Sequence, residues 1–136
     1  MLTFSADVWK FISERWIRLT AVGTAAALLM PGRMQPGDPM AYGTIAFGCP
    51  AMGSEELEDG EFGPMFSDCE KKLSGKKIAL FGSYGWGDGQ WMRDWQQRVD
   101  DANASLYNGE GLIINETPDD DGLEQCRQFG AGFAGF

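Results

Sequence analysis

From Tyr42 onward, short apolar runs alternate along the chain with stripes of apolar residues at helical spacing. The apolar runs are YGTIAFGC at 42–49, KKIALFG at 76–82 and GLIINE at 111–116. Runs of this length, bounded by glycine or polar residues, are typical of buried strands. We therefore expect a strand at each of these three places.

The segments between and after these runs carry helical patterns. Residues 61–75 place apolar side chains three or four positions apart, and residues 90–102 place Trp91 and Trp95 on one stripe, which predicts that both are core residues. Residues 119–133 begin with acidic side chains, which complement the positive end of a helix dipole. Strands that alternate with helices predict βαβ units and a doubly wound parallel sheet of the α/β class.

The first part of the chain lacks this regular pattern. Residues 31–39, PGRMQPGDP, hold three prolines, which forbid a continuous helix. We therefore divide the chain into an atypical N-terminal segment with a Pro/Gly linker at 1–39 and a regular domain at 40–136. The apolar residues 16–30 come with three basic residues, Lys10 and Arg15 before them and Arg18 near their start, as in a signal peptide. They are too few to span a membrane, which takes about 20. We expect an ordinary packing helix over 16–30, with a signal peptide as the alternative.

Charge and composition exclude several classes of function. The chain has 136 residues with 20 acidic and 11 basic side chains, a formal net charge of −9 and a pI of about 4.3. Nucleic acid and anionic membrane surfaces are poor partners for such a chain, whereas a basic protein suits an acidic face. Histidine is absent, which removes imidazole acid–base catalysis and Ser-His-Asp or Cys-His nucleophiles.

The three cysteines indicate neither a disulfide framework nor a zinc site. Cys49, Cys69 and Cys126 are odd in number, widely spaced and without a C-x-x-C pair. Reduced thiols of this kind fit a cytoplasmic location. No metal ligand set is expected.

Two loops are expected to meet at one edge of the predicted sheet. In an open parallel sheet, ligands bind outside the carboxyl ends of the strands, which places CPAMGSEELED at 49–59 beside SYGWGDG at 83–89. Together these loops offer glycines, a methionine, two aromatics and carboxylates. A flat, largely neutral ring would fit here, because Trp86 or Met52 can cover its faces and glycine lets backbone amides approach its polar edge.

These same segments carry a resemblance to a known family. GCPAMGSEELED, SGKKIALFGSYGWGDGQWM and ETPDDDGLEQCRQFG occur in this order. Through them residues 48–136 resemble the later two-thirds of a short-chain flavodoxin, and the resemblance begins near Met40, so it covers residues 40–136 but not the N-terminal 39. The resemblance implies a flavodoxin-like doubly wound fold and a low-potential one-electron carrier with non-covalent FMN. It further implies a flavoprotein of electron transport that is monomeric and cytoplasmic, is not an enzyme in its own right, and receives basic redox proteins on an acidic face.

The resemblance also assigns roles to the two loops. It implies that Met52, Gly53, Ser54 and Glu55 hold the inner face and N5 edge of the isoalloxazine ring, with Gly53 as backbone hinge at positive φ and Glu55 accepting from the N3 edge. It implies that Trp86 stacks on the outer face, while the pyrimidine and ribityl side is lined by Ser83, Tyr84, Gly85 and Gly89. Taken alone, Met52 would be a core filler, and the acidic cluster from Glu55 to Glu61 is usually a solvated face.

Residues 1–39 depart from the family pattern. A flavodoxin opens with a strand and an [ST]-x-T-G-x-T loop that wraps the FMN phosphate at a helix N-terminus. The nearest candidates here, Thr20, Gly23 and Thr24, have the wrong spacing. We therefore expect the N-terminal segment to replace the usual first βαβ unit, and one hypothesis is a shifted coding frame. If strands were lost there, the strand at 44–47 would become an exposed edge.

This departure leaves an alternative function open. A chain without a phosphate loop is a flavin-free or weakly flavin-binding remnant or interaction domain. A third class, a quinone or nitro reductase of the same fold, lacks an acid, a base or a nicotinamide fingerprint in the sequence.

Overall fold

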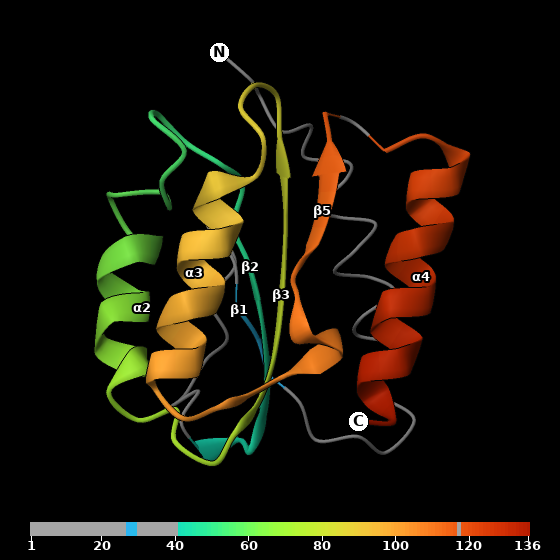
Figure 1. Ribbon diagram of the computed structural model, residues 1–136. Helices are drawn as coiled ribbons and strands as arrows, with labels where there is room; N and C mark the ends of the chain where they lie inside the picture. The colour runs from blue at the N-terminus through green and yellow to red at the C-terminus, as the bar shows by residue number, and fades with distance from the viewer. Residues whose placement is uncertain (1–26, 30–40, 117) are drawn as a thin grey trace.

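Figure 1 shows the computed structural model, which describes residues 27–29, 41–116 and 118–136. Its strands are β1 (Ala27–Leu29), β2 (Thr44–Gly48), β3 (Lys77–Tyr84), β4 (Ser105–Leu106) and β5 (Leu112–Asn115). Its helices are α2 (Phe62–Glu70), α3 (Gln90–Asp101), α4 (Asp120–Ala134) and a short 3-10 turn, η2 (Tyr107–Gly109). The strands and helices predicted from residue 42 onward are all present. The two-residue strand β4 was not predicted.

All the strands of the sheet run parallel. β2 lies between β1 and β3, and the other edge of β3 pairs first with β4 and then with β5. Thus β4 and β5 follow one edge of β3, and η2 interrupts them. This arrangement is the doubly wound parallel sheet expected from the alternation of strands and helices.

The structure corrects one prediction for the N-terminal segment. We expected a helix over 16–30, but Ala27–Leu29 forms a strand whose Ala27 pairs with Ile45 of β2. A short apolar run is compatible with either a strand or a helix, and here pairing to β2 decides it. β2 is therefore an internal strand, and the edge expected at 44–47 does not exist. The remaining predictions for residues 1–39 lie outside the described residues.

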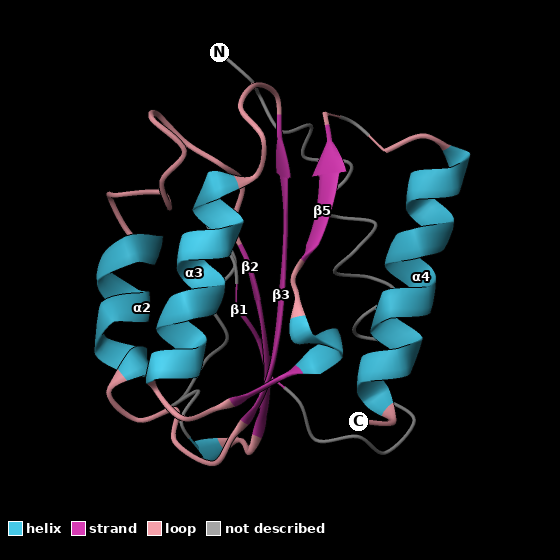
Figure 2. Cartoon of the chain, in the orientation of Figure 1, coloured by secondary structure: helices cyan, strands magenta, loops and turns pink. Residues whose placement is uncertain are grey.

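Alternation along the strands divides the core into two layers. Ile45, Phe47, Ile78 and Leu80 face α2 and α3, where Phe62, Phe66, Trp91 and Trp95 are fully buried. Ala46, Ala79 and Phe81 face the other side, against Phe133 of α4. Figure 2 shows these helices on either side of the sheet.

The larger layer is built from aromatic rings set edge to face. The Trp95 ring centre lies 5.6 Å from that of Phe62 and 5.7 Å from that of Phe66. Such pairs contribute about 0.5–1.5 kcal/mol beyond their buried area. The prediction that Trp91 and Trp95 are core residues is confirmed.

The carboxyl ends of β2, β3 and β5 lie at the same edge of the sheet, at the top in Figure 1. The connections from β2 to α2, from β3 to α3 and from β5 to α4 therefore meet there. This packing brings together the loops in which function is expected.

Candidate functional site

The loop after β2 is fixed at both ends of its first turn. The amide of Cys49 donates to the Phe81 carbonyl at 3.0 Å, and that of Ala51 donates to the Ser83 carbonyl at 2.9 Å, so the chain continues beside β3. Met52 and Glu56 then exchange two backbone hydrogen bonds of 2.8 and 2.9 Å. These bonds close a tight turn over residues 53–55.

This turn contains two residues with left-handed backbone. Gly53 has φ of 51° and Glu55 has φ of 57°. The positive φ expected at Gly53 is confirmed, and an added Cβ there would meet no atom within 4 Å. The turn presents Met52, Gly53 and Ser54 to solvent, with 42% of Met52 exposed.

The loop after β3 begins later than expected. Ser83 and Tyr84 belong to β3; Ser83 is buried, and the half-buried Tyr84 ring lies 5.6 Å from that of Trp91. The idea that Tyr84 lies in a loop is therefore wrong, because β5 pairs with β3 through this residue. The Tyr84 carbonyl also accepts from the amide of Glu116 at 2.7 Å.

The loop itself spans residues 85–89 and exposes an indole. Trp86 is 62% exposed, the highest value among the large hydrophobic side chains described. Gly87 and Gly89 have φ of 84° and 95°, and Gly89 is the buried N-cap of α3. Glycine provides these conformations without the strain that a side chain would impose.

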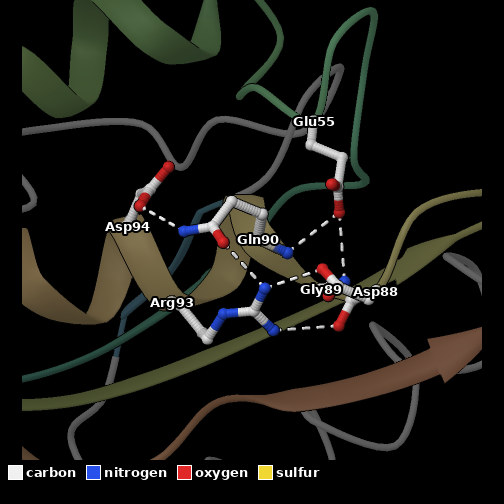
Figure 3. Close-up of polar contacts among 6 residues, drawn as sticks. All are labelled: Glu55, Asp88, Gly89, Gln90, Arg93 and Asp94. Carbon is white, nitrogen blue, oxygen red and sulfur yellow. Dashed lines mark hydrogen bonds and ion pairs between the residues drawn. The ribbon is translucent and has the colours of Figure 1, made fainter.

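A single carboxylate joins the two loops, as Figure 3 shows. Oε1 of Glu55 accepts from the amide of Gly89 at 3.0 Å and from that of Gln90 at 2.9 Å. These two amides stand at the N-terminus of α3, where a helix favours negative charge. An added Cβ at Gly87 would lie 2.4 Å from the Glu55 carboxyl carbon, so only glycine leaves room for this contact.

A guanidinium holds the same loop from the helix side. Arg93 donates from Nη1 to the Asp88 carbonyl at 3.0 Å and from Nη2 to the Asp88 carboxylate at 2.6 Å. Nη2 also donates to Oε1 of Gln90 at 2.8 Å. The side chain thereby turns back onto the first turn of its own helix.

The end of the β2 loop is capped by Glu58. Its carboxylate accepts from the amides of Phe62 at 2.7 Å, Glu61 at 2.9 Å and Gly60 at 2.6 Å. These backbone hydrogen bonds, that from Phe62 foremost, lower the pKa of Glu58. The side chain thus serves as the N-terminal cap of α2.

Cys49 supports this loop as an uncharged thiol. Its sulfur accepts from the Glu58 amide at 3.4 Å, and its carbonyl accepts from the buried Trp91 indole at 3.2 Å. Burial raises the pKa of Cys49 to about 12. Cys49 therefore brings no negative charge to the site at neutral pH.

Charge is distributed unevenly between the two edges of the sheet. The carboxyl edge carries the acidic residues of the three loops and of the first turn of α4, namely Glu55, Glu56, Glu58, Asp59, Glu61, Asp88, Glu116, Asp119, Asp120 and Asp121. The lysines of the described residues, Lys71, Lys72, Lys76 and Lys77, cluster around the connection from α2 to β3 at the opposite edge. Among the described residues, Arg93 is the cation at the carboxyl edge, and it is paired with Asp88. The edge that holds both loops is therefore strongly negative.

The structure brings the predicted residues to one edge of the sheet, where they differ in their exposure to solvent. Met52, Gly53, Ser54 and Trp86 are exposed, Glu55, Tyr84 and Gly85 are partly covered, and Ser83 and Gly89 are buried. Sequence analysis missed Gly87, Arg93 and Glu58. Gly87 carries a signal in the motif GWGDG, whereas no spacing rule identifies the contact of Arg93 with Asp88.

The exposed side chains suit a flat aromatic ligand. Of the four large hydrophobic side chains that are exposed in the described part of the chain, Met52 and Trp86 lie on the two facing loops. Two apolar side chains on a polar edge offer the faces that a planar ring needs. The residues present therefore fit an isoalloxazine ring.

Comparisons with known proteins identify the family of the chain. The Flavodoxin family model matches residues 19–130. The chain is similar to the flavodoxin of Megasphaera elsdenii, with 47% identity over 97 residues, covering 71% of this chain and 68% of that protein. It is also similar to the flavodoxin of Clostridium beijerinckii, with 45% identity over 96 residues, covering 66% of this chain and 64% of that protein.

Solved structures extend the likeness to the whole fold. The solution structure of two-electron reduced Megasphaera elsdenii flavodoxin matches 99% of this chain and 96% of its own, with a TM-score of 0.77 and 35% identity. Oxidised flavodoxin 2 of Bacillus cereus shares the fold, with a TM-score of 0.72 and 24% identity. The chain belongs to the flavodoxin family, whose members carry electrons with a non-covalent FMN.

Proposed function

We propose that Met52 and Trp86 cover the two faces of the isoalloxazine ring of FMN at the carboxyl edge of the sheet. The observation that supports this is their exposure, 42% and 62%, on loops that the Glu55 carboxylate ties together. Exposed apolar side chains on facing loops gain free energy when a ring covers them. FMN, when bound, supplies reversible one-electron transfer at low potential.

The remaining predicted residues have more specific roles in this proposal. Gly53 provides the positive φ of this turn, and its peptide is the hinge beside the N5 edge of the ring. Oε1 of Glu55 is engaged with α3, so Oε2 is the oxygen that meets the N3 edge of the ring. Ser54 lies with Met52 and Gly53 at the inner face and N5 edge. The pyrimidine and ribityl side is lined by Ser83, Tyr84, Gly85 and Gly89.

The charge distribution supports the further proposal that basic redox proteins dock at this edge. Carboxylates of three loops surround the ring site, while the described lysines lie at the opposite edge. The same carboxylates disfavour additional negative charge on a bound cofactor, which lowers its reduction potential. The chain acts in this proposal as a monomeric carrier and not as an enzyme.

A cytoplasmic location completes the proposal. The thiols of Cys49 and Cys126 have pKa values raised by burial to about 12 and about 11, and neither takes part in a disulfide. Reduced cysteines of this kind suit a reducing compartment. Within the described residues, no helix is long and apolar enough to cross a membrane.

Flavin titration of three variants tests the ring site. Trp86→Ala removes one stacking surface and is expected to weaken riboflavin and FMN binding by about 1–3 kcal/mol. Met52→Ala is expected to weaken both by a smaller amount. Tyr42→Ala, an exposed aromatic before β2, is the matched control and leaves both affinities unchanged. A Trp86→Ala protein with wild-type affinity would overturn the assignment.

Comparison of riboflavin with FMN tests the phosphate prediction. Hydrogen bonds to a charged group contribute about 1.5–3 kcal/mol each, so three donors to phosphate favour FMN by more than about a thousandfold. The sequence of residues 1–39 contains no phosphate-loop motif, and we expect the two affinities to differ by less than about tenfold. A preference for FMN of about a hundredfold or more would contradict this and direct mutagenesis to Thr20 and Thr24.

A further inference from the structure

The loop that carries Trp86 is held in place although its sequence favours mobility. Residues 85–89 contain three glycines, two of them at positive φ, and such a segment has many accessible conformations. Trp86 itself is 62% exposed, so its own packing contributes little to fixing the loop. The order of this loop must come from other side chains.

A carboxylate and a guanidinium bind residues 88–90, at the end of this loop, from opposite sides (Figure 3). On one side, the Glu55 carboxylate binds the amides of Gly89 and Gln90. On the other side, the Arg93 guanidinium binds the backbone carbonyl and the carboxylate of Asp88. Glu55 belongs to the loop after β2, whereas Arg93 belongs to α3.

The Arg93 contact has the geometry of a fixed fork. Its two terminal nitrogens reach three acceptors, two on Asp88 and one on Gln90, at 2.6–3.0 Å. The Gln90 side chain is itself anchored, since its Nε2 donates to the Asp94 carboxylate at 2.8 Å. A planar guanidinium imposes orientation on such a set, whereas an ammonium group acts as a point charge.

Because the ion pair of Arg93 with Asp88 is exposed, we expect it to affect the order of the loop more than the global stability of the protein. The side chains of Arg93 and Asp88 are 49% and 79% exposed. Exposed ion pairs contribute little to global stability. What the pair restricts is the conformation of residues 86–89, and a surface ordered before its ligand arrives avoids paying that entropy on binding.

We propose that Arg93 is a positioning residue that orders the Trp86 loop before the flavin ring binds. This inference rests on the proposed ring site. It assigns Arg93 no contact with the cofactor: the residue acts through Asp88 and Gln90 on the placement of Trp86.

The test uses the flavin-free protein and three variants. Arg93→Gln is expected to increase hydrogen exchange at the amides of residues 87–90 by about threefold to tenfold and to weaken riboflavin binding by a similar factor, while the urea midpoint is unchanged. Arg93→Lys keeps the charge without the fork and is expected to fall between wild type and Arg93→Gln. Arg127→Gln, which breaks the exposed α4 pair with Glu124, is the matched control with no effect on exchange or binding.

A fourth variant, changed on the loop side of the contact, excludes a simple folding defect. Asp88→Asn weakens the same contact from the loop side. In the double variant Asp88→Asn/Arg93→Gln, the amides of residues 87–90 are therefore expected to exchange no faster than in the faster-exchanging single variant. Additive effects would overturn the positioning role, as would wild-type exchange and affinity in Arg93→Gln. Wild-type affinity in Trp86→Ala would instead overturn the ring site, whatever the exchange rates show.

Discussion

Glu55 and Gly89 lie 34 positions apart in the sequence, yet Oε1 of Glu55 accepts a hydrogen bond of 3.0 Å from the Gly89 amide. The contact joins the β2 loop to the N-terminus of α3. The loop that carries Met52 and the loop that carries Trp86 are therefore connected, and we expect a substitution in one to alter the conformation of the other.

Removing this carboxylate is expected to destabilise the fold measurably. Glu55→Ala leaves the amides of Gly89 and Gln90 without their acceptor, and loss of a helix cap costs about 1 kcal/mol. Glu55→Gln keeps an acceptor and loses the charge at the helix terminus, which costs about 0.3–1 kcal/mol. Urea unfolding measures both changes. Glu56→Ala, its exposed neighbour, is the control, and equal midpoints for Glu55→Ala and Glu56→Ala would refute the bridge.

Two glycines with the same backbone requirement distinguish strain from contact. Gly53 and Gly87 both have positive φ, so alanine at either position costs about 1–2 kcal/mol of strain. An added Cβ at Gly53 meets open space, whereas at Gly87 it would meet the Glu55 carboxylate at 2.4 Å. Because Glu55 is flexible at its end, Gly87→Ala is expected to push it off the α3 amides.

Hydrogen exchange of the Gly89 and Gln90 amides measures this difference. Gly87→Ala is expected to lose about 1 kcal/mol more stability in urea than Gly53→Ala, because it also displaces the Glu55 cap. Only Gly87→Ala is expected to speed exchange at these two amides beyond the change in global stability. Equal exchange in the two variants would show that Gly87 serves the turn alone.

The sequence could predict those parts of the fold that depend on local patterns or on general rules of sheet topology. Helices α2, α3 and α4 follow from local periodicity, and so does the burial of Trp91 and Trp95, although α2 ends at Glu70 and not near Gly75. The register of the strands then brings both loops to one edge, which topology rules foresee. These features depend on patterns within a few residues of one another.

Other features depend on tertiary contacts and escaped prediction. β1 looked helical because an apolar run of its length has no distinguishing period, and pairing with β2 settles its state. β4 is two residues long and is defined by its bridges to Lys77 and Ile78. The link from Glu55 to α3 joins two loops, and no local pattern encodes it.

The Glu58 cap is expected to make stability depend on acidic pH. Its pKa is lowered in the folded state by hydrogen bonds from Phe62, Glu61 and Gly60. The carboxylate therefore stabilises the fold fully above the ordinary glutamate pKa of about 4.3, and this contribution is lost as the pH falls through the lower folded pKa. Glu58→Gln is expected to lose part of the stability at neutral pH and to show a shallower decline under acid.

Urea unfolding at several pH values between about 6 and 3 checks this expectation. Glu56→Gln is the control, because the Glu56 side chain is exposed and its hydrogen bonds to Met52 come from the backbone. Parallel curves for Glu58→Gln and wild type over the acidic range would contradict the assignment of the cap.

The unequal charge of the two sheet edges leads to the last prediction, which concerns docking. Long-range attraction between an acidic edge and a basic protein is screened as ionic strength rises, with a Debye length of about 30 Å at 0.01 M and about 8 Å at 0.15 M. Electron transfer from the reduced protein to a basic c-type cytochrome is therefore expected to slow by about tenfold over this range.

Neutralising single carboxylates locates the face that is responsible. Glu56→Gln and Asp59→Asn remove charge from the exposed β2 loop at the carboxyl edge and are expected to lower both the rate at low salt and its dependence on salt. Asp100→Asn removes an equal charge near the far end of α3, so its salt dependence is expected to stay close to that of wild type. Identical slopes for Glu56→Gln, Asp59→Asn and Asp100→Asn would mean that net charge alone governs encounter. A flat profile for the wild-type protein would remove electrostatic docking at this edge altogether, because a partner guided by the carboxylates around Met52 and Trp86 must sense the salt that screens them.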